Sequence, residues 1–279
     1  MILLTGATGT VGSALLRRLT ADGRPVRALV RDQRGLGDLA NPPSFRNALR
    51  GVDTVVHLAA SIRDQPYASI EELNAVATLR LVRAAERAGV RRLVFFSALN
   101  ARHHSRTRFF RAKALAEEAV EASTMETTVF HPSIIYTPGD PWLTLLDRLS
   151  RLPALPVSGS GRAVFEPVWA EDVAEAVMHS LSNGSGDAGY DLAGPELLSY
   201  DDIVRIALRS ARRRRRLLHV PLPIVRGSLW TLRRLVGPKV FATWEEAELM
   251  EEPMVSERGT ADIEQLGVHP HSMPAVLGR

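Results

Sequence analysis

Three glycines near the start of the chain have a spacing that suits phosphate binding. Gly6, Gly9 and Gly12 follow an apolar run over residues 1–4, and residues 13–20 have the pattern of an amphipathic helix. In a strand, turn and helix of this kind, the first glycine permits the turn, the second lets a pyrophosphate approach, and the third lets helix and strand pack closely. The N–H groups at the helix start then attract the phosphates. Because the spacing is G-x-x-G-x-x-G rather than G-x-G-x-x-G, the flanking strand and helix carry this prediction of a dinucleotide site; a purely structural turn is the alternative.

The residue placed to contact the cofactor's adenosine ribose is an arginine. Arg31 ends the second predicted strand, residues 25–30, about 20 residues beyond the glycines. An acidic residue there would bind the 2′-hydroxyl of NAD, whereas an arginine favours the 2′-phosphate of NADP. Asp32 follows directly, and a solvated arginine at a strand tip is the alternative interpretation. We predict NADP(H) as the preferred cofactor, with NAD(H) as the alternative.

Strands and helices alternate along the first half of the chain. Apolar runs predict strands over residues 25–30, 54–60, 92–97 and 127–132, and helices are predicted over 70–88 and 108–122. This alternation predicts an α/β fold with a doubly wound parallel sheet, helices on both faces, and ligands at the carboxyl ends of the strands. Residues 33–50 show no clear third strand, only a short helix ending at Leu49. His57 is expected to be packed or next to the cofactor rather than to act as a base.

The pattern changes after residue 140, which indicates a second structural unit. Residues 1–140 are predicted to form the dinucleotide-binding domain, to which residues 162–182 return. Residues 141–161 and 183–279 are predicted to form a small α/β substrate lobe. Within this lobe, the basic amphipathic segment 221–237 is expected to pack over the substrate cleft, and peripheral contact with a membrane is the alternative.

Composition excludes several other kinds of protein. The chain has no cysteine, which excludes disulfides, thiolate metal sites and a cysteine nucleophile, and we expect no metal site. No apolar run approaches the roughly 20 residues of a membrane-spanning helix. A strand that begins at residue 1 leaves no room for a signal peptide, so a cytoplasmic location is expected. The net charge is only +4, and the five arginines at 212–216 are expected to form a solvated turn, so no nucleic-acid partner is expected.

Several segments together resemble one known family. The chain contains, in order, TGATGTVG, GVDTVVHLAA, RRLVFFSAL, FFRAKALAEEAV, VFHPSIIYTPGD and FEPVWAEDVAEAV. On these segments, which extend over most of the chain, it resembles an atypical short-chain dehydrogenase/reductase of the NAD(P)-binding Rossmann superfamily. It is most similar to the complex I accessory-subunit-like and NmrA-like NADPH-binding subgroup, and less so to sugar-nucleotide epimerases.

The resemblance implies a catalytic pair of which this chain keeps one member. Catalytic relatives carry Tyr-x-x-x-Lys on one helix face, where the lysine lowers the pKa of the tyrosine and binds the nicotinamide ribose. Lys113 matches that lysine and Ser97 matches the strand-end hydroxyl that holds the substrate oxygen, but Phe109 stands at the tyrosine position. Phenylalanine has no proton to exchange, so ordinary keto reduction or epimerisation with the family's usual acid is not expected. His103 or His104 could supply a proton, although both are expected to lie in a solvated loop.

The resemblance and the predicted strand ends together define the expected site. Its catalytic residues are Lys113 and Ser97. Its cofactor contacts are Thr5, Gly6, Thr8, Gly9, Thr10, Val11, Gly12, Arg31, Asp38, Leu58, Ala59, Ala60, Asn74, Ser97, Lys113, His131, Pro132 and Ser133, and Asp38 would replace the family's Gly-Asp contact to adenine. Its substrate contacts are Ala98, Phe109, Tyr136 and Trp169.

Three functions are compatible with this sequence. The first is an NADP(H)-dependent reductase of a small or lipophilic carbonyl, enone or quinone-like acceptor. The second is a non-catalytic NADP(H)-binding redox sensor or assembly protein, and the third is an enzyme like the sugar-nucleotide epimerases and dehydratases. We predict NADPH binding with weak or absent dehydrogenase activity on ordinary alcohols, an unidentified small-molecule ligand, and a monomer or homodimer.

Overall fold

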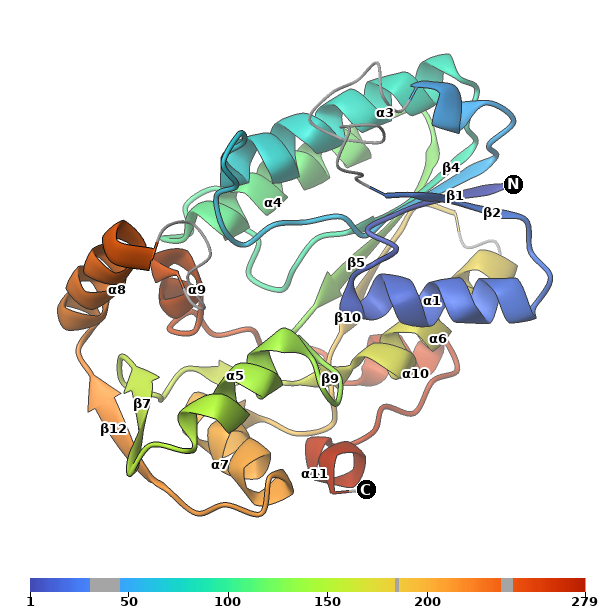
Figure 1. Ribbon diagram of the computed structural model, residues 1–279. Helices are drawn as coiled ribbons and strands as arrows, with labels where there is room; N and C mark the ends of the chain where they lie inside the picture. Colours follow the sequence, from blue (N-terminus) through green and yellow to red (C-terminus); the bar gives the residue numbers. More distant parts are fainter. Residues whose placement is uncertain (31–45, 184–185, 237–242, 279) are drawn as a thin grey trace.

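A computed structural model describes the backbone of residues 1–30, 46–183, 186–236 and 243–278. A six-stranded sheet in the order β10-β5-β4-β3-β1-β2 forms its centre, and every neighbouring pair of strands is parallel (Figure 1). The strands are β1 (Ile2–Thr5), β2 (Val26–Leu29), β3 (Thr54–His57), β4 (Arg92–Phe96), β5 (Glu126–Pro132) and β10 (Ala188–Leu192). The strand order reverses between β1 and β3, so ligands of such a sheet are expected at the carboxyl ends of these two strands.

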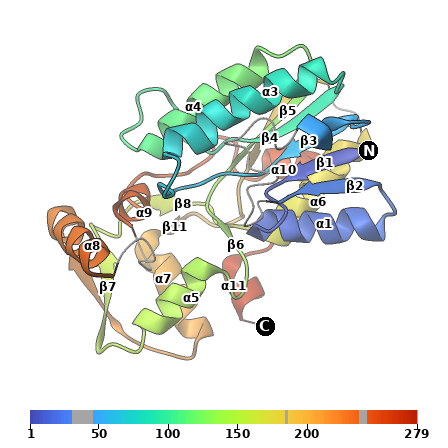
Figure 2. The same ribbon diagram turned by 45° about the horizontal axis from the view of Figure 1, so that its top comes forward.

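Helices cover both faces of the sheet. α1 (Thr10–Ala21) and α6 (Ala170–Asn183) lie on one face (Figures 1 and 2). On the other face lie α3 (Ala77–Arg87), which continues from a π-helical turn η2 (Glu72–Val76), and α4 (Arg108–Glu121). The described part of the chain therefore has the predicted doubly wound α/β architecture.

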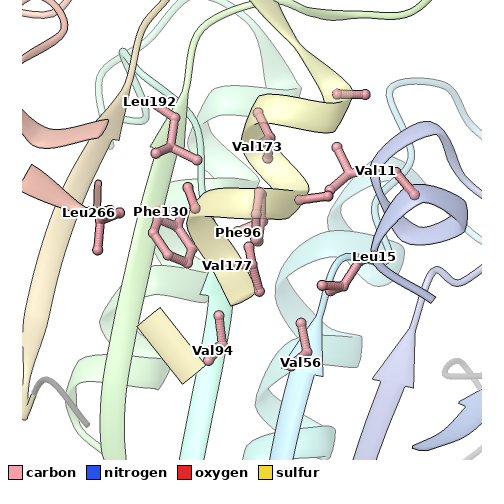
Figure 3. Close-up of a cluster of buried hydrophobic side chains, with 14 of the residues drawn as sticks. Val11, Leu15, Val56, Val94, Phe96, Phe130, Val173, Val177, Leu192 and Leu266 are labelled. Carbon is pink, nitrogen blue, oxygen red and sulfur yellow. The ribbon is translucent and has the colours of Figure 1, made fainter. Parts of the chain in front are cut away.

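Strands β1, β3 and β4 are buried along their whole length because helices cover both faces of the sheet. On β4, Val94 and Phe96 belong to the core cluster that includes side chains of α1 and α6 (Figure 3), whereas Leu93 and Phe95 belong to the cluster under α3 and α4. Successive residues of a strand point to opposite faces, so a doubly covered strand needs a continuous apolar run.

A smaller lobe lies beyond the carboxyl ends of the strands. Its elements are β6 (Ile135–Tyr136), α5 (Pro141–Leu149), β7 (Ala154–Ser158), β8 (Val164–Phe165), β9 (Val168–Trp169), β11 (Leu198–Ser199), α7 (Tyr200–Ser210), β12 (Arg216–Val220), α8 (Leu222–Val236), α9 (Trp244–Leu249) and α11 (Met273–Leu277). Phe110 and Tyr136 share a separate apolar cluster with Leu155, Phe165 and Ile203. In the part of the chain that the structure describes, no helix has the length and apolar character needed to cross a membrane.

Several expected boundaries are wrong. The strand expected over 54–60 ends at His57. The helix expected over 70–88 is helical over 70–87 but contains a π-helical turn at residues 72–76. The segment expected to return to the main sheet contributes α6, but β8 and β9 pair with β11 and β6 outside that sheet. Such short strands give no periodic pattern in the sequence, so only their pairing partners define them.

The expected division at residue 183 also differs from the structure. β10 completes the main sheet beside β5, and Ile263 of α10 (Ala261–Gln265) lies in the core cluster with α1 and α6. The chain after residue 183 therefore contributes to both clusters. Residues 33–50 are the region without a clear third strand. The structure describes residues 46–50 of it, where η1 (Arg46–Leu49) forms a turn of 3₁₀ helix.

Candidate functional site

The glycine turn forms a cradle that only glycine can build. Gly6 has a φ of 72°, in the left-handed region, and a Cβ placed on it would lie 2.7 Å from the backbone nitrogen of Ala59. A Cβ on Gly12 would lie 2.1 Å from the carbonyl oxygen of Gly6. These contacts bring the end of β1, the start of α1 and the residues after β3 into backbone contact, as the predicted roles of both glycines require.

Gly9 leaves the start of α1 free of a side chain. Among the described residues, a Cβ on Gly9 would meet only the carbonyl oxygen of Gly6, at 3.3 Å. Gly9 is also the N-cap of α1, and the described first turn of that helix has neither a side-chain cap nor an acidic residue. Its N–H groups and partial positive charge are therefore available to an anion. The exposed Thr8 and half-buried Thr10 flank this place, and Val11 packs inward, so a dinucleotide pyrophosphate fits the cradle.

A chain of hydrogen bonds holds the two strand ends behind the cradle. The Thr78 hydroxyl donates to the carbonyl oxygen of Asn74, so it accepts from Nε2 of His57, at 2.9 Å. Nδ1 of His57 then accepts from the Thr5 hydroxyl at 2.7 Å, and that hydroxyl accepts from the backbone N–H of Ala59. Burial lowers the pKa of His57 to about 3. The imidazole is therefore neutral and structural, in line with the prediction that it is packed rather than a base.

Asn74 shapes the loop that follows β3. Its side-chain oxygen accepts from the N–H of Ser61 at 3.1 Å, and its amide donates to the carbonyl oxygens of Ser61 and Ile70, both at 2.8 Å. Leu58 and Ala59 are half-buried and Ala60 is exposed in this loop. The amide of Asn74, an expected cofactor contact, is thus bonded to the backbone around the site.

Lys113 of α4 is buried against the end of β4. Only 3% of the residue is exposed, and its ammonium group donates to the carbonyl oxygen of Phe96 at 2.5 Å. Nζ lies 4.9 Å from the ring centre of Phe95 and 5.9 Å from that of Phe109. Burial lowers the pKa of Lys113 to about 7, although the carboxylate of Glu117 opposes this effect. The structure therefore brings Lys113 and Phe109 together, as the Tyr-x-x-x-Lys register predicts.

Ser97 is bonded to a residue that the sequence analysis missed. Its hydroxyl donates to Oε2 of Glu117, and Oε1 of Glu117 lies 2.8 Å from Nε2 of His131. Nδ1 of His131 lies 3.6 Å from Oδ1 of Asp191 on β10. Burial opposes both charges, but their mutual contact lowers the pKa of Glu117 and raises that of His131. The spacing of Glu117, four residues after Lys113 on the same helix face, was the signal that could have identified it.

The residues that end β5 are likewise bonded within the protein. The Ser133 hydroxyl donates to the carbonyl oxygen of Met254 at 2.7 Å and accepts from the N–H of Glu166, while the carbonyl oxygen of Pro132 accepts from Leu99. These expected cofactor contacts connect the sheet with the smaller lobe. Arg31 and Asp38, on which the NADP and adenine predictions depend, lie outside the described residues.

The four expected substrate contacts belong to one apolar cluster. Ala98 and Tyr136 are buried in it, and Phe109 and Trp169 pack against it. Burial raises the pKa of Tyr136, and among the described residues neither its hydroxyl nor Nε1 of Trp169 has a hydrogen-bond partner. The cluster is therefore an apolar wall beside Lys113 that contains two unpartnered polar groups.

The other candidate proton donors lie away from this wall. His103 and His104 are exposed, and the charged neighbour of His103 is Glu118, at 4.0 Å. This is the solvated loop that was expected. Arg108, which the sequence did not single out, pairs with Asp64 at 2.9 Å and Glu71 at 2.6 Å, and so connects the start of α4 to the loop after β3.

Two relatives resemble a large part of the chain in sequence. NADH dehydrogenase (ubiquinone) 1 alpha subcomplex subunit 9, mitochondrial, of Arabidopsis thaliana is 27% identical over 245 residues, 79% of this chain and 60% of that protein. Sterol demethylase protein B of Methylococcus capsulatus is 36% identical over 173 residues, 50% of this chain and 52% of that protein. The chain thus spans between about half and three fifths of these relatives' lengths.

The fold is also that of a solved epimerase. The UDP-glucose 4-epimerase of Thermus thermophilus, solved in complex with NAD, gives a TM-score of 0.73 at 18% identity, over 99% of this chain and 97% of that one. The model of the NAD dependent epimerase/dehydratase family matches residues 2–192, which contain the glycine cradle, Lys113 and the whole central sheet. The predicted resemblance is therefore confirmed, and the chain belongs to the NAD dependent epimerase/dehydratase family of Rossmann-type NAD(P)-binding proteins.

Proposed function

We propose that this protein binds NADP(H) and slowly reduces a lipophilic carbonyl, enone or quinone-like acceptor. The observation that carries the proposal is the pairing of an open glycine cradle with a buried Lys113 beside Phe109. The cradle suits a dinucleotide, and the lysine is the family residue expected to bind its nicotinamide ribose. The phenylalanine removes the usual proton donor, so turnover is slow.

The bound dinucleotide would supply hydride, and the chain would supply position and a proton. Gly9 and the start of α1 would hold the pyrophosphate, and Lys113 the ribose. A group whose pKa lies near the working pH is an efficient proton donor, and the pKa of Lys113 is about 7. We therefore assign to Nζ of Lys113 the proton that neutralises the anion formed by hydride transfer. Because Nζ is also bonded to the carbonyl oxygen of Phe96 and would hold the ribose, this transfer is slower than from the family's tyrosine. The hydroxyl of Ser97 is engaged by Glu117, so in this proposal it orients that carboxylate rather than the substrate.

The surroundings of Lys113 favour an apolar acceptor. Phe109, Ala98 and Trp169 form or border the apolar cluster next to it. A charged sugar nucleotide would need polar partners here, whereas a ketone or quinone on an apolar body needs a polar contact only at its oxygen. The name of one relative, sterol demethylase protein B, refers to a lipophilic substrate class. Both points favour reductase over epimerase chemistry.

A non-catalytic role is the second candidate, and Phe109 favours it. A dinucleotide held without an acid beside it would act as a structural or redox-sensing ligand. One relative is named as a subunit of NADH dehydrogenase. In this case cofactor binding would remain, and no acceptor would be reduced at a useful rate.

The test combines cofactor titration with substitution of Phe109. NADPH fluorescence should saturate, with a lower Kd than NADH, for the wild type, Phe109→Tyr and the matched control Phe109→Leu. With long-chain aldehydes and quinones, Phe109→Tyr should oxidise NADPH on the order of 100-fold faster than wild type, since a general acid contributes about that factor. Phe109→Leu should give no gain.

Each half of the proposal can fail separately. If neither NADPH nor NADH fluorescence saturates, both the reductase proposal and the non-catalytic binding role are wrong. Saturation without any gain in Phe109→Tyr would leave the non-catalytic role, and equal affinity for NADH would remove the NADP preference. Rapid reduction by the wild type that Phe109→Tyr does not increase would contradict the proposed defect.

A further inference from the structure

Acidic and basic residues are segregated along the chain. Residues 203–244 contain eleven arginines and lysines and no aspartate or glutamate. The whole chain has 35 basic and 31 acidic residues, so the remainder has 24 basic and 31 acidic residues, a net charge of −7. The total of +4 therefore conceals an acidic protein with one strongly basic segment.

The structure places β12 and α8, which carry part of this segment, on one outer edge of the smaller lobe. Arg214 and Arg216 are exposed at the turn before β12, and α8 follows directly. Figure 1 shows β12 and α8 together on the side opposite the N-terminus, and Figure 2 shows α8 on that side as well. α8 packs against α9, where Arg226 lies over the ring of Trp244, and Val225 of α8 is 9% exposed. The packing of 221–237 over the substrate cleft stays a prediction.

The outward face of α8 and β12 exposes large apolar side chains. Trp230 is 61% exposed, Ile224 60% and Leu218 of β12 58%. Isolated exposed apolar residues are ordinary, but a tryptophan and two branched aliphatic side chains on adjoining elements of one basic edge are not. We name Leu218, Ile224 and Trp230, together with Arg226 and Arg234 of α8, the α8 edge.

Arginines flank the tryptophan along the helix. Arg226, Trp230 and Arg234 follow one another at a spacing of four residues and so form one stripe of α8. The guanidinium of Arg234 lies 5.1 Å from the ring centre of Trp230, and that of Arg226 lies 5.5 Å from the ring centre of Trp244 on α9. An indole between two long cationic side chains is the arrangement that suits the headgroup level of a bilayer.

We propose that the α8 edge binds the surface of an anionic lipid bilayer. The arginines of the α8 edge would lie against the negative headgroups, with Trp230, Ile224 and Leu218 at the boundary with the acyl chains. The net charge of −7 on the remaining residues would turn the rest of the protein, including the glycine cradle, away from the membrane. The exposed aliphatic side chains favour a bilayer over RNA, which binds cations and stacking rings but gains little from Ile224 or Leu218.

The test is binding of the full chain to vesicles of defined composition. Vesicles of phosphatidylcholine with 30% phosphatidylglycerol should sediment the wild type, and pure phosphatidylcholine vesicles should bind at least tenfold less. Tryptophan emission should shift to the blue on the anionic vesicles, and Trp230→Phe should lose that shift. Arg226→Glu with Arg234→Glu should reduce binding at least tenfold, with an unchanged far-ultraviolet circular dichroism spectrum.

The matched control is a second pair of exposed arginines at a helical spacing. Arg83→Glu with Arg87→Glu, on α3, changes the total charge by the same amount and should bind anionic vesicles within threefold of wild type. Equal loss of binding in both double variants would overturn the proposal, as would equal binding to neutral vesicles. An unchanged emission spectrum in the presence of bound anionic vesicles, together with tight binding to single-stranded RNA, would show a polyanion site and also overturn it.

Discussion

Burial determines the chemistry of Lys113 more than any neighbouring residue does. Its Nζ donates to a backbone carbonyl oxygen, lies over the ring of Phe95, and has Glu117 one turn away. Removal of water disfavours the ammonium form, so the pKa decreases from 10.5 to about 7. An amine with this pKa exchanges its proton near neutral pH, which a solvated lysine does not.

The depressed pKa predicts a pH dependence of stability. Between about pH 7 and 10.5 the unfolded chain binds a proton at Lys113 that the folded chain does not, so the free energy of unfolding should increase with pH in this window. The expected contribution between pH 7 and 9.5 is on the order of 1–3 kcal/mol. Urea unfolding should show this increase for the wild type and for the exposed control Arg83→Met, but not for Lys113→Met. Identical slopes in all three proteins would contradict the burial argument.

At this scale the sequence predicts local relations well and distant ones poorly. The glycine cradle and the Lys113–Phe109 pair follow from spacings of a few residues, and the structure has both. The contact of His131 with Asp191 depends on β10 lying beside β5, which no local pattern indicates. The bonds of Asn74 to Ser61 and Ile70 join residues closer in sequence, but the loop that they hold has no periodic pattern that would predict them.

At the scale of elements, two glycines of one turn have different tasks. A Cβ on Gly12 would lie within 3 Å of the backbone of Gly6 and Ala7, which cannot rotate away. Gly9 has an ordinary φ of −77°, and among the described residues a Cβ there would meet the carbonyl oxygen of Gly6 at 3.3 Å. Gly12 therefore joins α1 to β1, and Gly9 admits the ligand. The strand and the helix were predictable here because the apolar and amphipathic periods are strong, but α1 begins at Thr10, three residues before the expected start.

This difference predicts that substitution by alanine lowers a different quantity at each position: stability at Gly12 and cofactor affinity at Gly9. Gly12→Ala should decrease the free energy of unfolding by about 3 kcal/mol through overpacking. Gly9→Ala should change it by less than about 1 kcal/mol but weaken NADPH binding at least tenfold, since the methyl group occupies the place of the pyrophosphate. Thermal unfolding without cofactor and fluorescence titration measure the two effects. Normal stability of Gly12→Ala, or normal affinity of Gly9→Ala, would show that the assigned roles are wrong.

At the scale of the whole molecule, the C-terminal part is fixed to the edge of the sheet by buried polar contacts. Asp262 on α10 is 4% exposed and accepts from the N–H of Asp191 on β10 at 2.9 Å. The Ser256 hydroxyl donates to Asp191 and its N–H donates to Glu166, both at 2.7 Å. The boundary expected at residue 183 was wrong because these contacts join segments distant in sequence.

Removal of one such contact should affect the entire protein. Asp262→Ala would leave the N–H of the half-buried Asp191 without this partner and should decrease the free energy of unfolding by about 1–3 kcal/mol. The exposed neighbour Glu264 provides the control, and Glu264→Ala should change it by less than about 0.5 kcal/mol. Urea unfolding followed by circular dichroism and by tryptophan emission should give coincident transitions for both variants. Separate transitions, or equal stabilities, would show that the contact is not part of the cooperative unit.

The position of β10 in the sheet has a consequence for synthesis of the chain. β5 pairs on one side with β4, but Thr128 finds its partner on the other side only at Ala188. While the nascent chain is shorter than this, β5 is an edge strand with unpaired N–H and C=O groups, and such an edge can pair with another chain. Ribosome stalling between these two points should therefore yield an aggregation-prone intermediate, and release beyond residue 192 should rescue it.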